Sequence, residues 1–307
     1  MKHALALVIA LLLAPLAALQ AADVAPTVLY VSESGENRIA VYSLDEKTGE
    51  LTCAGAVELS GAPGSITISA DRAHLYAAVR PEMQFATLTI DRATGLLSDP
   101  VFCPAGMNAA FVQVDKTGRW LLAASFSEGL VTLSRITNGV IRGAPIQTMA
   151  TGSKAHAIKI DASNRFAFVP HVAELNKVEQ LRFDPVAGTL ASNTPPSMAG
   201  GPGQGPRHMQ FHPNGRWGYL VNEQGQSVTL CDYDQGAGHL KIRQTISTPP
   251  EDWDKSKGTS ADIHLSADGR FAYASNRGHD SLAVLVIRNR FSLRFRSSRA
   301  RYRRGAR

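Results

Sequence analysis

Four side chains with complementary chemistry occupy equivalent places along this chain: one imidazole, one carboxylate and two guanidiniums. They are His156, Glu223, Arg207 and Arg277. A guanidinium binds carboxylates, phosphates and developing alkoxides through a rigid fork of N–H donors. A donor placed at the oxygen that gains charge when water attacks an ester carbonyl stabilises the transition state by about 3 kcal/mol. Because a glutamate or a histidine can take the proton from that water, the set predicts four catalytic residues acting on an anionic or oxyanion-forming substrate.

A repeated unit along the chain must position these residues. Each unit has a strand with alternating apolar residues, a tight polar turn and a second strand. Asn-Gly or Asp-Gly at some of the turns supplies the positive φ angles that short hairpins need. The turn residues recur at intervals of 46 to 54 residues: Arg72, Gly118, Asn164, Gly215 and Gly269. A degenerate sixth unit is centred near Pro26.

This period predicts an all-β fold, a β-propeller. Three or four strands about every 45 residues form one blade, and blades stack radially because a single sheet cannot bury both of its faces alone. A two-sheet sandwich rarely repeats its sequence at this length, and a helical solenoid would show a period of about 3.6 residues. The pattern therefore predicts one propeller domain over residues 22–287, with about six recognisable blades.

The same repeats predict where the candidate residues meet. Residues eight positions before and after each turn residue lie at the open end of the hairpin, beside one mouth of the central channel. Five of these ten positions carry small or apolar side chains, and the five polar exceptions are Arg80 and the four residues above. With the nearby polar groups they define a candidate substrate-binding set: Arg80, His208, Asn222, Asp262 and His264. In an alternative interpretation, the charged groups form ion pairs that tie adjacent blades together.

The first residues predict export. A basic Lys2 precedes an apolar run from Ala4 to Leu19, and small residues follow near Ala21 and Ala22. This pattern is typical of a secretory signal peptide, here over residues 1–21. The apolar run is short for a membrane span, which needs about 20 residues. We therefore expect a periplasmic or secreted protein without a stable membrane span.

The last residues, 288–307, differ from the rest of the chain. They contain nine arginines and no acidic residue, and they account for the net charge of +6, since the propeller region is mildly acidic. A basic tail can bind nucleic acid, but an exported protein meets little of it, and the blade pattern stops at Ile287. We therefore expect no nucleic-acid partner and an altered or out-of-frame, non-propeller tail. Because no closing strand is visible, closure of the ring is doubtful.

Other chemical signals are weak. His208 and His212 are four apart, and on a strand that spacing separates the side chains by about 13 Å, which disfavours a shared metal. The glycine-rich segment 200–206 contains prolines and leads into a strand, unlike a phosphate-binding loop. No Gly-x-Ser-x-Gly motif is present, which disfavours serine-hydrolase chemistry. The sequence thus predicts a site without a metal or cofactor.

Several segments resemble the bacterial 6-phosphogluconolactonase family, which has a seven-bladed propeller. They are GPRHMQFHPNG from Gly205 to Gly215, VNE ending at Glu223, ADIH ending at His264, DGR ending at Arg270 and VRPE from Val79 to Glu82. The resemblance extends from residue 28 to about residue 287. The same superfamily includes fungal carboxymuconate cycloisomerases, whose proposed catalytic groups are a histidine, a glutamate and two arginines. By position in the repeats, the resemblance implies these roles for His156, Glu223, Arg207 and Arg277.

The leading hypothesis is hydrolysis of a sugar-type lactone by a monomer. The partner would be a small lactone or an anionic sugar derivative, bound by Arg207 and Arg277, with Glu223 and His156 handling protons. Because the phosphorylated lactone of the family is cytoplasmic, an exported member is expected to act on another lactone. One alternative is a non-enzymatic exported binding scaffold. Another is a muconate-type cycloisomerase, whose dicarboxylate pocket Arg80 would help to form.

Overall fold

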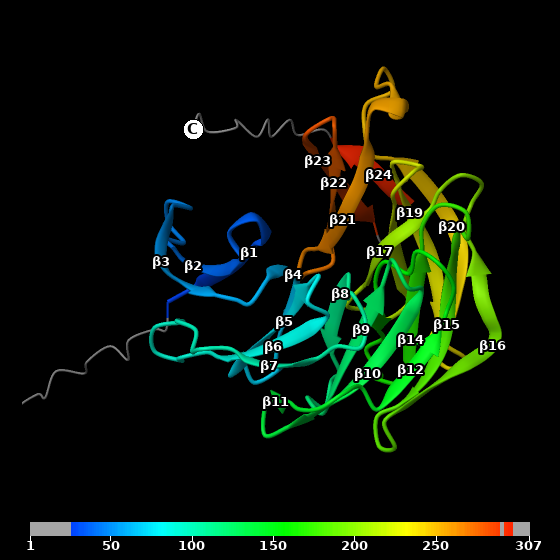
Figure 1. Ribbon diagram of the computed structural model, residues 1–307. Coiled ribbons are helices and arrows are strands. Elements are labelled where there is room, and N and C mark those ends of the chain that lie inside the picture. The colour runs from blue at the N-terminus through cyan, green and yellow to red at the C-terminus, as the bar shows by residue number, and fades with distance from the viewer. Residues whose placement is uncertain (1–25, 289–291, 297–307) are drawn as a thin grey trace, which may run out of the picture.

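The structure, a computed structural model, describes residues 26–288 and 292–296, so the predicted signal peptide over 1–21 lies outside the described residues. Within these described ranges, regular structure is almost entirely β, with strands β1 to β24 and two short 3-10 helices, η1 (Ser34–Glu36) and η2 (Lys255–Lys257). The strands form six antiparallel sheets, named sheets 1 to 6 in chain order, which fan around a common axis (Figure 1). The prediction of an all-β propeller with about six blades is confirmed.

Successive strands of the chain are neighbours within each sheet. Sheet 1 contains β1 (Val28–Glu33), β2 (Arg38–Leu44) and β3 (Leu51–Glu58), and sheet 2 contains β4 (Ala62–Ile68), β5 (His74–Arg80), β6 (Gln84–Thr89) and β7 (Val101–Pro104). Sheet 3 contains β8 (Phe111–Val114), β9 (Trp120–Ser125), β10 (Leu130–Thr137), β11 (Val140–Ile141) and β12 (Gln147–Ala150). Sheet 4 contains β13 (Lys159–Ile160), β14 (Phe166–His171), β15 (Lys177–Asp184) and β16 (Thr189–Ala199). Sheet 5 contains β17 (Pro206–Phe211), β18 (Trp217–Asn222), β19 (Ser227–Asp234) and β20 (His239–Ser247), and sheet 6 contains β21 (Thr259–Leu265), β22 (Phe271–Arg277), β23 (Ser281–Arg288) and β24 (Ser292–Arg296).

The polar turns between the two inner strands are held by their own side chains. In sheet 3, Asp115 Oδ1 accepts hydrogen bonds from the amides of Arg119 and Trp120, each at 2.9 Å. Gly118 in this turn has a φ of 71°, a left-handed conformation that glycine adopts without steric cost. The turn that was predicted from the sequence therefore forms, and it sets the register of the two strands that lead to the channel.

Apolar side chains between neighbouring sheets form the core. Five buried clusters lie between consecutive sheets, for example around Leu122 and Val169 between sheets 3 and 4, and around Phe168 and Leu220 between sheets 4 and 5. Burial of a large apolar side chain contributes about 1.5–3 kcal/mol. Each sheet is thus stabilised by the neighbours that cover its faces, as the stacking of blades requires.

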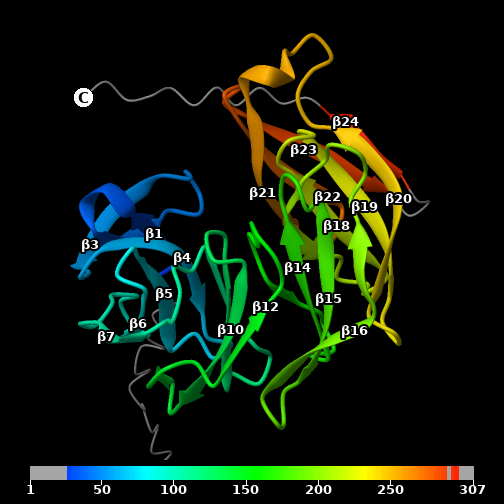
Figure 2. The ribbon, with the colours of Figure 1, turned by 45° about the vertical axis from the view of Figure 1, so that its right-hand side comes forward.

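Sheets 1 and 6 are the exception to this stacking. Among the described residues no apolar cluster joins them, and both ribbon views show them standing apart (Figures 1 and 2). Sheet 1 has three strands where each of the other sheets has at least four. In sheet 6 the fourth strand is β24, which pairs with β23 and lies within the arginine-rich segment. The last sheet therefore extends past residue 287, where the propeller was expected to end.

Candidate active site

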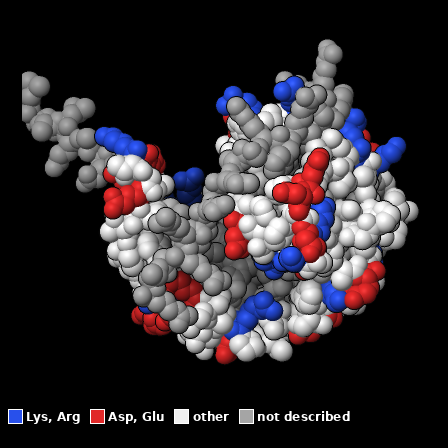
Figure 3. Space-filling view, turned by 90° about the horizontal axis from the view of Figure 1, so that it is seen from above, with Lys and Arg blue, Asp and Glu red and all other residues white. Residues whose placement is uncertain are grey.

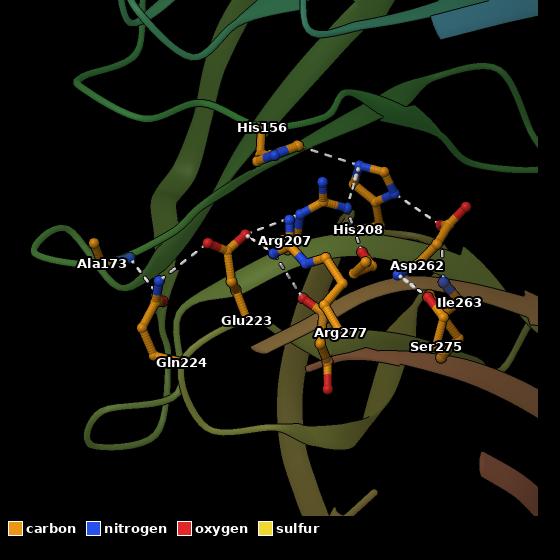
Figure 4. A network of polar contacts seen from close by, with 12 residues as sticks. His156, Ala173, Arg207, His208, Glu223, Gln224, Asp262, Ile263, Ser275 and Arg277 are labelled. Atoms are coloured by element: carbon orange, nitrogen blue, oxygen red, sulfur yellow. Dashed lines mark hydrogen bonds and ion pairs between the residues drawn. The ribbon is translucent and has the colours of Figure 1, made fainter. Parts of the chain in front are cut away.

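Side chains from sheets 5 and 6 converge on the carboxylate of Glu223, which directly follows β18 (Figure 4). Its Oε2 lies 2.9 Å from Nε of Arg207 on β17 and 3.3 Å from Nη2 of Arg277 at the end of β22. The side chains of Arg207 and Glu223 are only 14% and 18% exposed, whereas that of Arg277 is 50% exposed. Arg207 is thus the inner guanidinium and Arg277 the outer one at this mouth of the channel.

Backbone carbonyls of sheet 6 anchor both guanidiniums. Nη1 of Arg207 donates to the carbonyl of Ala261, and Nη2 of Arg277 donates to the carbonyl of Ser260 at 3.3 Å. Nε of Arg207 makes no directed hydrogen bond among the described residues, so its contact with Glu223 is an ion pair without hydrogen-bond geometry. The fork of Arg207 is therefore only partly satisfied by directed hydrogen bonds to the protein.

Two imidazoles and a second carboxylate extend the cluster away from Glu223. Nε2 of His208 lies 3.2 Å from Nδ1 of His156 and 3.4 Å from Nη1 of Arg207. On its other side, Nδ1 of His208 lies 2.8 Å from Oδ1 of Asp262. The second oxygen of Asp262 lies 3.1 Å from Nε2 of His264. Asp262, His208 and His156 thus form a continuous chain of polar contacts across sheets 6, 5 and 4.

The environment changes the protonation of these groups. Burial, with the positive charge of Arg207 and the neighbouring His208, lowers the pKa of His156 to about 3. Burial also lowers the pKa of His208, although its hydrogen bond with Asp262 opposes that change. For Asp262, burial raises the pKa, but the hydrogen bonds from His208 and His264 outweigh it and hold the pKa well below the usual range. The hydrogen bond to Asp262 raises the pKa of His264.

β-Bulges on the inner strands aim several of these side chains. In β17 the register shifts between Pro206, opposite Asn222, and His208, opposite Val221, so Arg207 is an extra residue. In β21 the register shifts between Ser260 and Ile263. A bulge breaks the strict alternation of a strand and re-aims its side chains. This is why the adjacent residues Arg207 and His208 both take part in one cluster.

Most of the predicted site residues meet in this cluster. Those in the network of Figure 4, or in direct contact with it, are His156, Arg207, His208, Glu223, Asp262, His264 and Arg277. Arg80 is placed in sheet 2, where its Nε donates to Oδ1 of Asn108 outside that network. Asn222 is 2% exposed, and its amide donates to the hydroxyls of Ser227 and Thr229, each at 2.8 Å. Its side chain therefore holds the hairpin of sheet 5, and its role in binding substrate stays a prediction.

Three residues next to the cluster were not predicted as site residues. The ring edges of Phe111 and Phe126 pack against His208 and His156, with ring centroids 5.3 and 5.7 Å apart. Lys159 of β13 interacts electrostatically with Asp262, and burial lowers its pKa to about 8. The signal for Lys159 was the polar position between two apolar residues of the inner strand, which places a side chain toward the channel.

Figure 3 shows a hollow on one face of the molecule, with acidic and basic side chains on its border. A separate cavity of about 680 Å³ lies at the turns of sheets 1 and 2, beside Asp71 and Arg92, and contains none of the predicted site residues. Within residues 26–288 and 292–296, no group of three or more histidines, cysteines or acidic residues is arranged to hold a metal. No helix in the described ranges is long and apolar enough to span a membrane.

The fold agrees with what comparison with known proteins shows. The family described as "Lactonase, 7-bladed beta-propeller" matches residues 16–102 and 103–304. The chain therefore belongs to the seven-bladed β-propeller lactonase family.

Its relatives include named enzymes of that family. A 6-phosphogluconolactonase of Pectobacterium carotovorum is 31% identical over 262 residues, covering 85% of this chain and 77% of the relative. The 6-phosphogluconolactonase of Yersinia pestis is 32% identical over 261 residues, with coverages of 84% and 76%. Among solved structures, the periplasmic gluconolactonase of Pseudomonas aeruginosa superposes with a TM-score of 0.77 at 23% identity, covering 87% of this chain and 80% of that one. A protein from Lactobacillus plantarum has a TM-score of 0.76 at 24% identity, with coverages of 88% and 81%.

Proposed function

We propose that this protein hydrolyses a sugar-type lactone at the cluster around Glu223. The observation that carries the proposal is the convergence of two guanidiniums, a carboxylate and a neutral imidazole at one mouth of a lactonase-family propeller. These are the groups that opening of a cyclic ester needs: donors for the carbonyl oxygen and an acceptor for the proton of water.

In the proposed reaction, water adds to the lactone carbonyl carbon and the carbonyl oxygen becomes an alkoxide. Arg207 and Arg277 are placed to bind this oxygen or an anionic group of the substrate. His156 and Glu223 are the candidates to take the proton from the attacking water. The bond from the carbonyl carbon to the ring oxygen then breaks, and the ring oxygen receives a proton to become the hydroxyl of the open acid.

One observation favours the non-enzymatic alternative. The contact between Glu223 of sheet 5 and Arg277 of sheet 6 ties adjacent blades, as a purely structural ion pair would. A purely structural pair needs no neutral imidazole beside it. It also needs no inner guanidinium whose Nε makes no directed hydrogen bond to the protein. For the cycloisomerase alternative, Arg80 was expected to help form the dicarboxylate pocket, and its Nε donates to Oδ1 of Asn108 outside the network of Figure 4.

The apolar N-terminal run and the relation to a periplasmic gluconolactonase of the same fold support a periplasmic or secreted location. A fusion of residues 1–25 to a reporter that is active only after export tests this part of the proposal. Export of the reporter supports the location, and retention in the cytoplasm contradicts it.

The proposed activity is tested with a panel of lactones, namely sugar lactones with and without a phosphate and a simple aliphatic lactone. Acid release is measured at constant pH. We expect turnover of at least one sugar lactone, and a loss of about 100-fold in Glu223→Ala, which removes the partner of both guanidiniums. Asp252→Asn serves as the control because Asp252 is exposed and outside the cluster. Absence of turnover across the panel would favour the binding scaffold, and an unchanged rate in Glu223→Ala would remove that residue from the site.

A further inference from the structure

We infer that Asp262 and His208 are positioning residues that form a relay to His156 and make Nε2 of His156 the base for the attacking water. This inference rests on the proposed lactone hydrolysis. It gives Asp262 and His208 a role different from the substrate binding predicted for them, and it assigns the proton transfer to His156 in place of Glu223.

The geometry of Asp262 defines the starting point of the relay. Its backbone amide donates to Oγ of Ser275 at 3.0 Å, and its Oδ1 accepts from the amide of Ile263 at 2.8 Å. Its Oδ2 is occupied by His264. The carboxylate is thus held from three directions and presents Oδ1 to His208. Because an ionised carboxylate only accepts hydrogen bonds, Nδ1 of His208 must carry a hydrogen.

The tautomer of His156 follows from that of His208. In a neutral ring protonated on Nδ1, Nε2 is an acceptor. Nε2 of His208 faces Nη1 of Arg207, which can only donate, and Nδ1 of His156. For the contact of 3.2 Å between the two rings to be a hydrogen bond, Nδ1 of His156 must therefore donate. This leaves Nε2 of His156 with a free lone pair, and among the described residues no hydrogen bond engages that atom.

The charges around the relay favour moving the proton away from His156. His156 faces Arg207, Arg277 and His208, all of which disfavour a positive charge on its ring. His208 faces Asp262, whose negative charge favours the imidazolium, as well as Arg207 and His264, which oppose it. Lys159 is a further cation near Asp262, and His264 shares that carboxylate. Of the two rings, His208 is thus the one with a carboxylate at hydrogen-bond distance, and that carboxylate favours a positive charge on the ring and opposes the effect of burial.

Two linked proton transfers, from water to His156 and from His156 to His208, accompany the attack of water. Water loses a proton to Nε2 of His156 while its oxygen forms a bond to the lactone carbonyl carbon. The hydrogen on Nδ1 of His156 moves to Nε2 of His208, so His156 remains neutral and His208 becomes an imidazolium paired with Asp262. When the ring oxygen leaves, the two transfers reverse and the proton passes to that oxygen. In this scheme Glu223 keeps the two guanidiniums in place.

Aromatic contacts hold the two imidazole rings of the relay in their orientation. Phe126 packs its edge against His156, Phe111 packs against His208, and the two imidazoles meet at an interplanar angle of 66°. Neither ring can turn freely without losing these contacts. Packing inside the propeller thus fixes the positions of the two imidazoles, unlike two exposed side chains that happen to lie close together.

The first test reads the tautomers directly and does not require turnover. Protein with 15N-labelled histidine rings is examined by long-range proton–nitrogen correlation near neutral pH, and the signals of the two rings are assigned by their loss in His156→Gln and His208→Gln. We expect both rings to carry hydrogen on Nδ1, and the signal of His156 to shift toward a tautomer mixture in Asp262→Asn. Hydrogen on Nε2 of His156 in the unmodified protein would overturn the relay.

The second test is kinetic and uses a lactone that the panel identifies. Asp262→Asn and His208→Gln should each lower kcat about 100-fold with KM changed by less than about twofold, because the relay acts on the base and not on binding. Asp252→Asn is the matched control, and circular dichroism checks that each variant is folded. A raised KM with unchanged kcat would show that Asp262 binds substrate, against the relay. If the unmodified protein opens no lactone, the proposed function fails, and the ring tautomers still decide the relay.

Discussion

Oε2 of Glu223 lies 2.9 Å from Nε of Arg207, although Arg207 occupies a β-bulge in β17 and Glu223 directly follows β18. The backbone fixes both ends of this contact. The amide of Glu223 donates to the carbonyl of Gly205 at 2.7 Å, and its carbonyl accepts from Ser260 of sheet 6 at 3.1 Å. Gly205 has a φ of 64°, which favours glycine there. The ion pair is therefore built into the junction between two blades.

Replacing Arg207 by lysine should abolish most of the activity. A lysine ammonium is a point charge and cannot reach Glu223 and the carbonyl of Ala261 together as the guanidinium does. We expect kcat/KM to fall about 100-fold in Arg207→Lys. Steady-state kinetics on the active lactone measure this, with Arg243→Lys on β20, paired to Asp232 at the outer edge of sheet 5, as the control. Equal rates in the two variants would show that Arg207 has no role specific to a guanidinium.

Replacing Glu223 by glutamine should destabilise the protein as well as inactivate it. Loss of the carboxylate leaves the largely buried Arg207 without its counter-ion, and breaking a buried pair from one side costs several kcal/mol. Because some exposure remains, we expect the free energy of unfolding in urea to fall by about 2 kcal/mol. Arg277→Gln should cost less, since Arg277 is half exposed. A Glu223→Gln variant more stable than the parent would contradict this and indicate a strained site.

Stability should decrease in mild acid because of His156. Its pKa is about 3 in the folded protein, against 6.5 ordinarily, so as pH falls through 6.5 the unfolded chain binds a proton that the folded chain does not. The free energy of unfolding should therefore decline from pH 6.5 toward pH 3. His171 and His208, whose pKa values are also lowered, act in the same direction.

A comparison with His156→Gln isolates the contribution of His156. Urea unfolding is measured at several values between pH 6.5 and about pH 5.5, a window in which the carboxylates of the unfolded chain remain largely ionised. We expect a shallower decline in the variant than in the unmodified protein. Parallel curves would show that the imidazole of His156 is freely protonated in the folded state.

Asn222→Ala should impair stability and leave substrate binding intact. The buried amide holds the hydroxyls of Ser227 and Thr229, so its loss leaves both without that donor. We expect a decrease of about 1–3 kcal/mol in the free energy of unfolding and a KM changed by less than about twofold. A large increase in KM with unchanged stability would instead support the substrate-binding role predicted from the sequence.

The repeated strand, turn and strand predicted the propeller because periodicity is a local property. Alternation of apolar residues decides which strand face is buried, and turns such as that at Gly118 decide where the chain reverses. Equivalent positions in successive repeats then lie at one mouth, which is why His156, Arg207, Glu223 and Arg277 could be grouped although they are distant along the chain. The location of the cluster was thus available from the sequence.

Tertiary structure alone decided what each group contacts. The bulges in β17 and β21 insert residues that the alternation does not reveal, and they turn Arg207 and His208 toward the same cluster while Asn222 is turned into the sheet. The order Asp262, His208, His156 depends on packing between three blades, and so does the lowered pKa of His156. Sequence therefore determined the blades and the mouth at which the polar residues gather. Hydrogen-bond direction and desolvation, which arise only when the sheets pack, determined which imidazole can act as a base.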